Sequence, residues 1–273
     1  MNDGVEFIRM HSIFLEPNAA LERSKVPLFH HTQTMAVASS IAGGCFWFTR
    51  ADCFFDQLEI RYGIEVFLEA QSKRSDHKSK EENEFIIKRI GESLRNSYIL
   101  SLTDSPNRPF MRKLYGEYVV KIAPWCIRTL FSAILYSKQT GGDGWNLFQL
   151  NDIFERVEGH VVYERSEQVS RASKVLEVLD HVRENKSSDK LTYEMEVMEL
   201  HRLISTNIVL FKRESFCEEQ EYRVCLVRKP NLGFELDPAF EFPHPARKTD
   251  DGRDKMMLEV NYRADHQGLL EIL

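Results

Sequence analysis

Apolar and polar residues alternate with a period of two in several short stretches of the chain, which is the pattern of a half-buried β-strand. These stretches are rich in β-branched and aromatic residues, and glycine, proline or charged residues bound them. The pattern predicts strands at 28–31, 45–49, 98–103, 118–122, 160–164, 207–211, 233–236 and 257–262.

Other stretches carry apolar residues three or four positions apart, which is the spacing of one helix face. This spacing predicts helices at 32–42, 85–94, 125–138, 169–182 and 193–204. We expect Thr32 to cap the first helix and the glycines at 43–44 to end it. Pro124 suits the first turn of the third helix.

The order of these elements indicates the fold class. The helices are too unevenly placed among the strands for a doubly wound parallel sheet, so we expect an α+β fold. We expect one domain over residues 1–273, with a sheet core formed by 28–166 and 207–262. Residues 167–206 are then a helical excursion between strands.

The stretch 211–228 reads as a charged loop that leads into a strand. In extended chain, Glu219, Glu221 and Arg223 share one face because side chains alternate. The opposite face is largely apolar and is expected to face a core; it carries Gln220, Tyr222, Val224 and Leu226. Two interpretations stay open for the charged face: an exposed ladder of ion pairs, or the wall of a cleft.

Charge and cysteine content narrow the function classes. The net charge of −6 works against nucleic acid and anionic lipid as partners, although a local basic patch can still bind either. No apolar run approaches the roughly 18 residues of a membrane span, and the first residues lack the pattern of a signal peptide. Five scattered cysteines without a CxxC pair favour a reducing cytoplasm over a disulfide framework.

Two clusters of polar residues are candidates for chemistry. His30 and His31 are neighbours on a predicted strand, so they point to opposite faces and do not share a metal. One of them is expected to face inward, as a hydrogen-bonded core residue or a ligand-binding group, and the pattern leaves open which one. Asp56 and Glu59, three residues apart, suit either a cation or arginine site or a solvated acidic face.

Aromatic and hydroxyl side chains add further candidates. Phe46, Trp47 and Phe48 form an aromatic strand; core packing explains most of it, but one ring must point away and can stack on a planar ligand. Ser101 and Thr103 share a strand face and can donate hydrogen bonds to a ligand. The chain has no GxSxG, HExxH or GxGxxG pattern and no complete phosphate loop, which excludes the common hydrolase, metalloprotease and dehydrogenase classes.

Four short motifs in order resemble those of a large, poorly characterised bacterial family. Its members open with Leu-Tyr-His-Tyr-Thr, continue with Phe-Asn-Asp-Pro-x-Glu and Ser-x-Ser/Thr, and finish with Trp-x-x-Glu-x-Glu-Tyr-Arg. The matching residues here are 28–32 (LFHHT), 54–59 (FFDQLE), 101–103 (SLT) and 216–223 (FCEEQEYR). The chain departs from the family at Arg112, where the family has a tryptophan, and in the first residue of the last motif. The resemblance covers about residues 28–228.

The layout of that family is similar to the ADP-ribosyltransferase architecture, a split mixed or antiparallel sheet with flanking helices. The resemblance implies that His30 holds a ribose hydroxyl of NAD with support from Thr32, and that an aromatic ring at 46–48 stacks on nicotinamide. Ser101 joins this binding set. Glu221 would bind the ribose 2′-hydroxyl beside the reacting carbon, where a fixed carboxylate stabilises the positive charge left by departing nicotinamide.

The same resemblance assigns roles to the two charged neighbours of Glu221. Glu219 would position the acceptor nucleophile. Arg223 would orient the carboxylates by charge-assisted hydrogen bonds, although a buried pair of Arg223 with a glutamate also has a purely structural explanation.

The leading hypothesis is therefore a cytoplasmic bacterial transferase that moves ADP-ribose from NAD to a nucleic acid or protein. The resemblance suggests a toxin or anti-phage effector, with an antitoxin among its expected partners and no membrane association. A non-catalytic sensor or interaction module of the same fold is the alternative. A third interpretation is a metal-dependent nuclease built on Asp56, Glu59, Glu219 and Glu221, against which the acidic net charge weighs.

Overall fold

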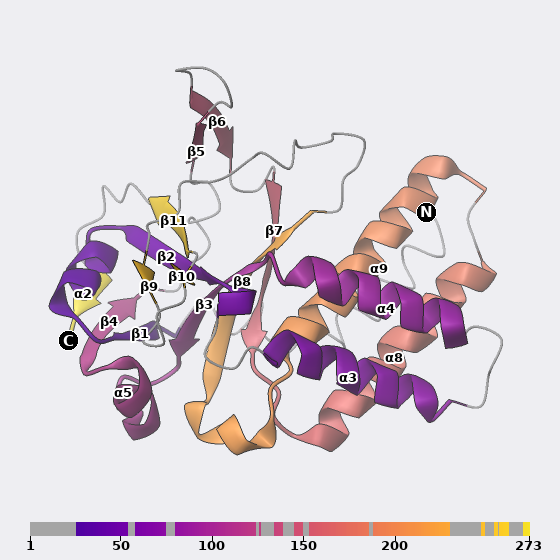
Figure 1. Ribbon diagram of the computed structural model, residues 1–273, viewed down its shortest axis with the longest axis horizontal. Coiled ribbons are helices and arrows are strands. Elements are labelled where there is room, and N and C mark those ends of the chain that lie inside the picture. Colours follow the sequence, from indigo (N-terminus) through magenta and orange to yellow (C-terminus); the bar gives the residue numbers. More distant parts are fainter. Residues whose placement is uncertain are drawn as a thin grey trace. The chain divides into compact units, whose positions relative to one another are not determined.

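The computed structural model describes residues 26–53, 58–74, 80–123, 126, 134–138, 145–149, 153–185, 188–229, 247–248, 254–255, 257–261 and 270–273 (Figure 1). The chain divides into two compact units. The helical unit comprises Met1–Ala19, Asp56–Arg95 and Val157–Cys217, and the sheet unit comprises Ala20–Phe55, Asn96–Arg156 and Glu218–Leu273.

The sheet unit is built on an antiparallel sheet whose central path runs β11-β2-β3-β1-β4-β12 (Figure 1). Strand β8 pairs with β3, and β7, whose first residues belong to this unit, pairs with β8. The strands are β1 (Leu28–Thr32), β2 (Cys45–Arg50), β3 (Tyr98–Thr103), β4 (Tyr118–Ile122), β7 (Phe154–His160), β8 (Glu221–Arg228), β11 (Met257–Asn261) and β12 (Leu270–Ile272). The combination of helices with an antiparallel sheet confirms the predicted α+β class.

The sheet forks at β3. Strand β8 pairs with the whole length of β3, from Tyr98 to Thr103. The other edge of β3 is shared: β2 pairs only with Tyr98 and Ile99, and β1 pairs only with Thr103. Residues 100–102 therefore lie at a fork between β1 and β2, because a strand has only two edges.

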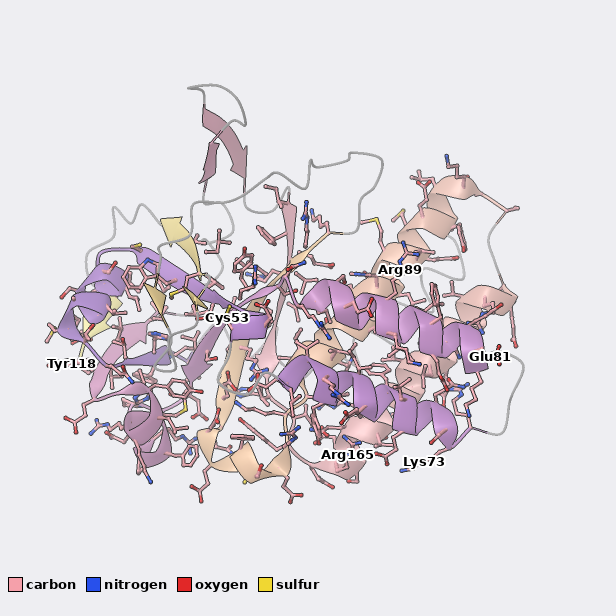
Figure 2. All side chains as sticks on the ribbon, viewed as in Figure 1. Cys53, Lys73, Glu81, Arg89, Tyr118 and Arg165 are labelled. Atoms are coloured by element: carbon pink, nitrogen blue, oxygen red, sulfur yellow. The ribbon has the colours of Figure 1, made fainter. Side chains whose placement is uncertain are left out.

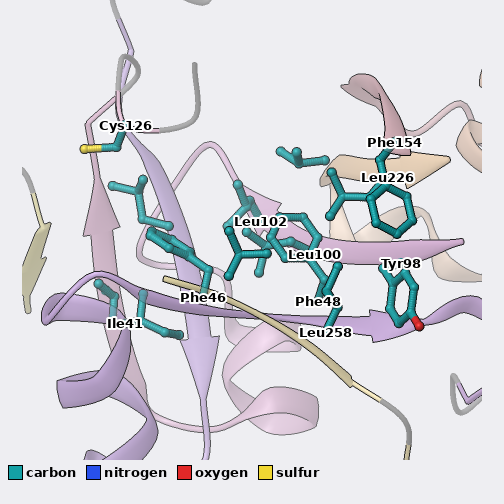
Figure 3. Packing of buried hydrophobic residues seen from close by; sticks show 14 of the residues in the cluster. Ile41, Phe46, Phe48, Tyr98, Leu100, Leu102, Cys126, Phe154, Leu226 and Leu258 are labelled. Carbon is teal, nitrogen blue, oxygen red and sulfur yellow. The ribbon is translucent and has the colours of Figure 1, made fainter. Parts of the chain in front are cut away.

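One face of this sheet carries the hydrophobic cluster of the unit. Phe46 and Phe48 from β2 meet Leu100 and Leu102 from β3 (Figure 3). Helix α2 (Met35–Ala42) contributes Ala38 and Ile41 to the same cluster. The remaining members are Tyr98, Val120, Ile122, Cys126, Ile153, Phe154, Tyr222, Val224, Leu226, Leu258 and Val260.

Smaller elements complete the described part of the chain. They are the 3₁₀ turns η1 (Ala51–Cys53) and η3 (Glu214–Glu219), helix α5 (Pro109–Tyr115), and the strand pairs β5 (Ile134–Lys138) with β6 (Trp145–Gln149) and β9 (Arg247–Lys248) with β10 (Asp254–Lys255).

Four helices form the core of the helical unit: α3 (Glu59–Ser72), α4 (Lys80–Leu94), α8 (Arg165–Glu184) and α9 (Lys190–Leu210). Helices α3 and α9 approach closely at Gly63, where an added Cβ would lie 2.5 Å from the carbonyl oxygen of Ile208. On the surface, Glu69 accepts hydrogen bonds from Lys73 at 2.5 Å and from Arg165 Nε at 3.0 Å. Figure 2 labels Lys73 at the end of α3 and Arg165 at the start of α8.

Several predicted elements are wrong for one physical reason: short apolar runs do not distinguish strand from helix. The run at 207–210 is the last turn of α9, where every residue is buried, so it lacks a polar face. Residues 134–138 of the predicted helix at 125–138 form strand β5. The strand predicted at 160–164 lies earlier, as β7, and helices α3 and α5 were not predicted.

The predicted cap of the first helix is wrong, and two other predictions remain open. Helix α2 is capped by Thr34 rather than Thr32, since the Thr34 side chain accepts a hydrogen bond from the Val37 amide at 3.3 Å. The strand predicted at 233–236 lies outside the described residues. A single domain with a helical excursion at 167–206 stays a prediction; α8 and α9 occupy that stretch.

Candidate polar face of the forked sheet

The register of β3 and β8 gathers polar side chains on one face of the sheet. Ser101 lies opposite Arg223, and Thr103 lies opposite Glu221. Directly opposed residues of an antiparallel pair point to the same side, so these four side chains share a face. The intervening residues belong to the hydrophobic cluster on the other side. We call the face with Ser101, Thr103, Glu221 and Arg223 the polar face.

Glu221 and Arg223 form a two-pronged ion pair on this face. Arg223 Nε donates to Glu221 Oε1 at 2.9 Å, and Arg223 Nη2 donates to Glu221 Oε2 at 2.9 Å. Each side chain is only 1% exposed. A planar guanidinium that binds both carboxylate oxygens fixes the orientation of the carboxylate, and the pair compensates the desolvation of each charge.

Glu219 does not continue this face, so the prediction of three charged residues in one row is wrong. Glu219 ends the 3₁₀ turn η3, and β8 begins only at Glu221. Gln220 between them has φ of 44°, a left-handed conformation that breaks the alternation of an extended chain. Glu219 is nevertheless buried.

His30 lies at the fork. Its Nδ1 is 3.0 Å from the carbonyl oxygen of Ser101, one of the β3 residues that neither β1 nor β2 pairs with. A carbonyl only accepts hydrogen bonds, so Nδ1 carries the proton. His30 is opposite Val120 of the hydrophobic cluster, which places its side chain on the side away from Glu221. Thr32, two residues later, is on the same side as His30 and is buried.

His31 is the histidine that shares the side of the polar face. Phe29 is opposite Thr103, and His31 follows Phe29 by two residues, so the three side chains point the same way. His31 is 4% exposed, and neither ring nitrogen has a hydrogen-bond partner among the described residues. Burial is the main cause that lowers the pKa of His31, and Arg112 adds to it; the backbones of Gly116 and Ser105 act in the opposite direction.

The aromatic strand β2 divides between the two sides. Phe46 and Phe48 are fully buried in the hydrophobic cluster and have no surface for a ligand, which corrects their prediction as binding residues. Trp47 points the other way and is half-buried. Because Thr49 is opposite Ile99, Trp47 shares the side of Ser101.

Two hydroxyl groups complete the polar face. Ser101 Oγ is buried and has no hydrogen-bond partner among the described residues. Thr103 Oγ1 donates to the carbonyl oxygen of Ser105 at 2.8 Å, which ties the end of β3 to the loop that follows. The place of Thr103 opposite Glu221 depends on strand pairing, which the sequence of one strand does not reveal.

The acids proposed for a metal site do not form one in the described residues. Asp56 lies outside them, and Glu59 is buried in the helical unit, where Lys212 Nζ is 3.0 Å from its Oε1. No group of three or more His, Cys, Asp or Glu side chains that suits a metal ion occurs in the described part of the chain.

Comparison with protein-family models, with curated proteins and with solved structures finds no match to this chain. Within the described residues, no helix has both the length and the apolar character of a membrane-spanning segment.

Proposed function

We propose that the sheet unit is an ADP-ribosyltransferase-like module that transfers ADP-ribose from NAD to a nucleic acid or protein. The observation that carries the proposal is the buried, doubly hydrogen-bonded Glu221 on the polar face of a forked antiparallel sheet. A fork in the sheet agrees with the split sheet of that enzyme class. A role as a toxin or anti-phage effector, with an antitoxin partner, belongs to the same proposal.

The residues of the polar face suit the chemistry. Departure of nicotinamide leaves positive charge on the ribose, and the Glu221 carboxylate stabilises that charge when it is held rigid and dry. Arg223 holds it rigid through two hydrogen bonds. A preorganised group of this kind contributes roughly 3 kcal/mol, on the order of a hundredfold in rate.

NAD would contact the side of the sheet that carries Trp47 and Ser101. The ring of Trp47 is partly exposed and suits stacking on nicotinamide, and the Ser101 hydroxyl has a hydrogen bond to offer. Strands β1 and β8 lie two strand spacings apart, roughly 10 Å. One bound nucleotide can span that distance. We assign His30 and Thr32 to holding the fork, since they lie on the opposite side.

The altered place of Glu219 changes its proposed role. A buried carboxylate at the end of η3 is poorly placed to meet a macromolecular acceptor. We therefore assign it to ordering the entry into β8 and leave Glu221 as the acid of the reaction. A cytoplasmic setting is part of the proposal, because the five cysteines are scattered along the sequence without a CxxC pair, which favours a reducing compartment.

A non-catalytic interaction module is the second candidate, and one observation favours it. Arg223 occupies one lone pair on each oxygen of Glu221, and the pair is sealed from solvent. A carboxylate held in this way has a complete structural explanation without any substrate. This candidate predicts that the protein binds no NAD.

The test is transfer of label from NAD to RNA, DNA and protein acceptors by the wild-type chain and by Glu221→Gln. We expect transfer by the wild type and a loss on the order of a hundredfold in Glu221→Gln. The matched control is Glu271→Gln, which removes an exposed carboxylate of the same unit that pairs with Lys121 at 3.1 Å. Equal transfer by Glu221→Gln and the wild type contradicts the role of Glu221; no transfer and no NAD binding by the wild type supports the module.

A further inference from the structure

Helix α5 and its flanks form a strap over strand β1. The strap comprises residues 104–116 and contains the seven-residue helix Pro109–Tyr115, which packs against β1. Met111 is the buried side chain of this helix, whereas Arg112, Lys113 and Leu114 are exposed. A short helix with so small a buried surface depends on its ends for its position.

Both ends of the strap are tied to the sheet. At the first end, Thr103 Oγ1 donates to the Ser105 carbonyl at 2.8 Å. At the second end, Gly116 has φ of 108° and lies against the chain that leaves β1; an added Cβ would be 2.4 Å from the Thr32 carbonyl oxygen. Within the strap, Arg108 Nη2 donates to Asp104 Oδ1 at 2.7 Å.

His31 is enclosed by this strap. Arg112 of α5 and the backbones of Ser105 and Gly116 on its two flanks are the groups that act on the imidazole. From the neighbouring strands, β4 places Val119 opposite His31, and β3 places Thr103 on the same side; neither titrates near neutral pH. Glu221 and Arg223 lie on β8, beyond β3, and bind each other.

We propose that the strap is a proton-sensitive latch, and that protonation of His31 releases it from β1. The closed strap holds a neutral imidazole, since burial disfavours a charged ring there and the cation of Arg112 repels it, and these two effects outweigh the backbones of Gly116 and Ser105, which favour the charged form. Opening returns the ring to water. This inference does not depend on NAD binding.

The sign of the pH dependence follows from the direction of the pKa shift. In the closed state the pKa of His31 is below its ordinary value of 6.5, mainly because of burial. In the open state it returns to about 6.5. Opening therefore takes up a proton below that pH, and the open fraction rises as pH falls, by up to about tenfold per pH unit.

Hydrogen exchange of the full-length protein tests the latch. The probes are the amides of Arg112 and Gly116, which donate to Arg108 and Arg112 inside the strap. We expect their protection factors, corrected for intrinsic exchange, to fall by up to about fivefold between pH 6.5 and 5.5. The Ala38 amide in α2 of the same unit is the internal control and is expected to keep its protection.

Three variants separate the latch from general acid unfolding. His31→Gln is expected to remove the pH dependence at Arg112 and Gly116, whereas His30→Gln retains it. Arg112→Ala, at an exposed position, removes the repelling cation and is expected to reduce the fall in protection, whereas Lys113→Ala is expected to leave it unchanged.

The outcomes that overturn the latch are specific. Protection that is constant from pH 6.5 to 5.5 in the wild type contradicts it, and so does an equal fall in His31→Gln. If His31→Gln does not fold, NMR titration of the His31 ring in the wild type decides. Titration that coincides with loss of strap protection supports the latch, and titration without any such loss refutes it.

Discussion

Two acid–base pairs, one in each unit, are buried almost completely but connect the chain in different ways. In the helical unit, Lys212 Nζ lies 3.0 Å from Glu59 Oε1 and joins the chain two residues beyond the end of α9 to the first turn of α3. In the sheet unit, Arg223 binds Glu221 two residues away on the same strand. The first pair links distant segments; the second does not.

This difference separates what each pair contributes. A pair between distant segments fixes how the helices meet, and the Glu59 carboxylate also interacts favourably with the start of α3. The hydrogen bonds between Glu221 and Arg223 join residues of one strand, and burial of the pair requires two charges to leave water. The Glu59–Lys212 pair therefore serves the packing of the helices, and the proposed function assigns the Glu221–Arg223 pair to the chemistry of the polar face.

The largest expected effect is on the stability of the helical unit. Lys212→Met leaves Glu59 buried without its cation, and we expect a loss of about 3–5 kcal/mol in the free energy of unfolding. Urea denaturation measures it, with hydrogen exchange in α3 to locate the change. The double variant Glu59→Leu/Lys212→Met is expected to recover most of the loss; a mild single variant would mean that this pair does not hold the helices together.

A somewhat smaller loss of stability is expected when the Glu221–Arg223 ion pair is broken. Arg223→Met leaves the Glu221 carboxylate buried, and we expect a loss of about 2–4 kcal/mol. The measurement is denaturation of the full chain with exchange of the β3 and β8 amides. Arg223→Lys serves as the control that keeps the charge but lacks the planar fork, and it is expected to fall between Arg223→Met and the wild type.

Replacement of a third buried acid, Glu196, is expected to raise stability rather than lower it. Glu196 is 2% exposed, its Oε2 has no hydrogen-bond partner among the described residues, and burial raises its pKa while His181 opposes the shift. A raised pKa means that stability is lost as pH rises above 4.5, the ordinary value.

Glu196→Gln is therefore expected to raise the denaturation midpoint at pH 8, with a gain that disappears near pH 4. The check is a series of denaturation curves across that range. A variant less stable than the wild type at pH 8 would show that Glu196 has a partner that matters.

The smallest effect is expected at an exposed pair. Arg61 and Glu65 lie on one face of α3 at 3.1 Å, with side chains 70% and 49% exposed. Arg61→Ala is expected to change stability by no more than about 0.5 kcal/mol, and added salt should remove the difference. A loss comparable to that of Lys212→Met would mean that burial is not what separates these pairs.

The sequence predicted the strands that alternate cleanly. Strands β1, β2, β3, β4 and β11 lie where alternation placed them, because each has one face on the hydrophobic cluster. The last turn of α9 was missed because every residue in it is buried, so it shows no polar face. Helix α3 was missed although its buried residues Ile60, Gly63, Phe67 and Ala70 follow helical spacing. The fork at β3 depends on which strands pair, and no local pattern encodes that.

The candidate site was predictable only in part, for a related reason. Alternation correctly placed Glu221 and Arg223 on one face, and their spacing suggested the ion pair that forms. It failed at Glu219, because this residue ends η3 and the left-handed Gln220 separates it from the extended chain of β8. Alternation also did not predict which of His30 and His31 lies on the side of Glu221. It places them on opposite sides of the sheet, but only the pairing of Phe29 with Thr103 shows which side carries Glu221.

The double variant Glu221→Leu/Arg223→Met tests the central claim most directly, with NAD binding by calorimetry and urea denaturation measured on the same sample. Hydrophobic replacement of a buried ion pair is often neutral, so we expect stability within about 1 kcal/mol of the wild type. We also expect NAD affinity to fall by on the order of a hundredfold, about 2.7 kcal/mol. A stable variant that binds NAD as the wild type does, or a wild type that binds none, would contradict the account.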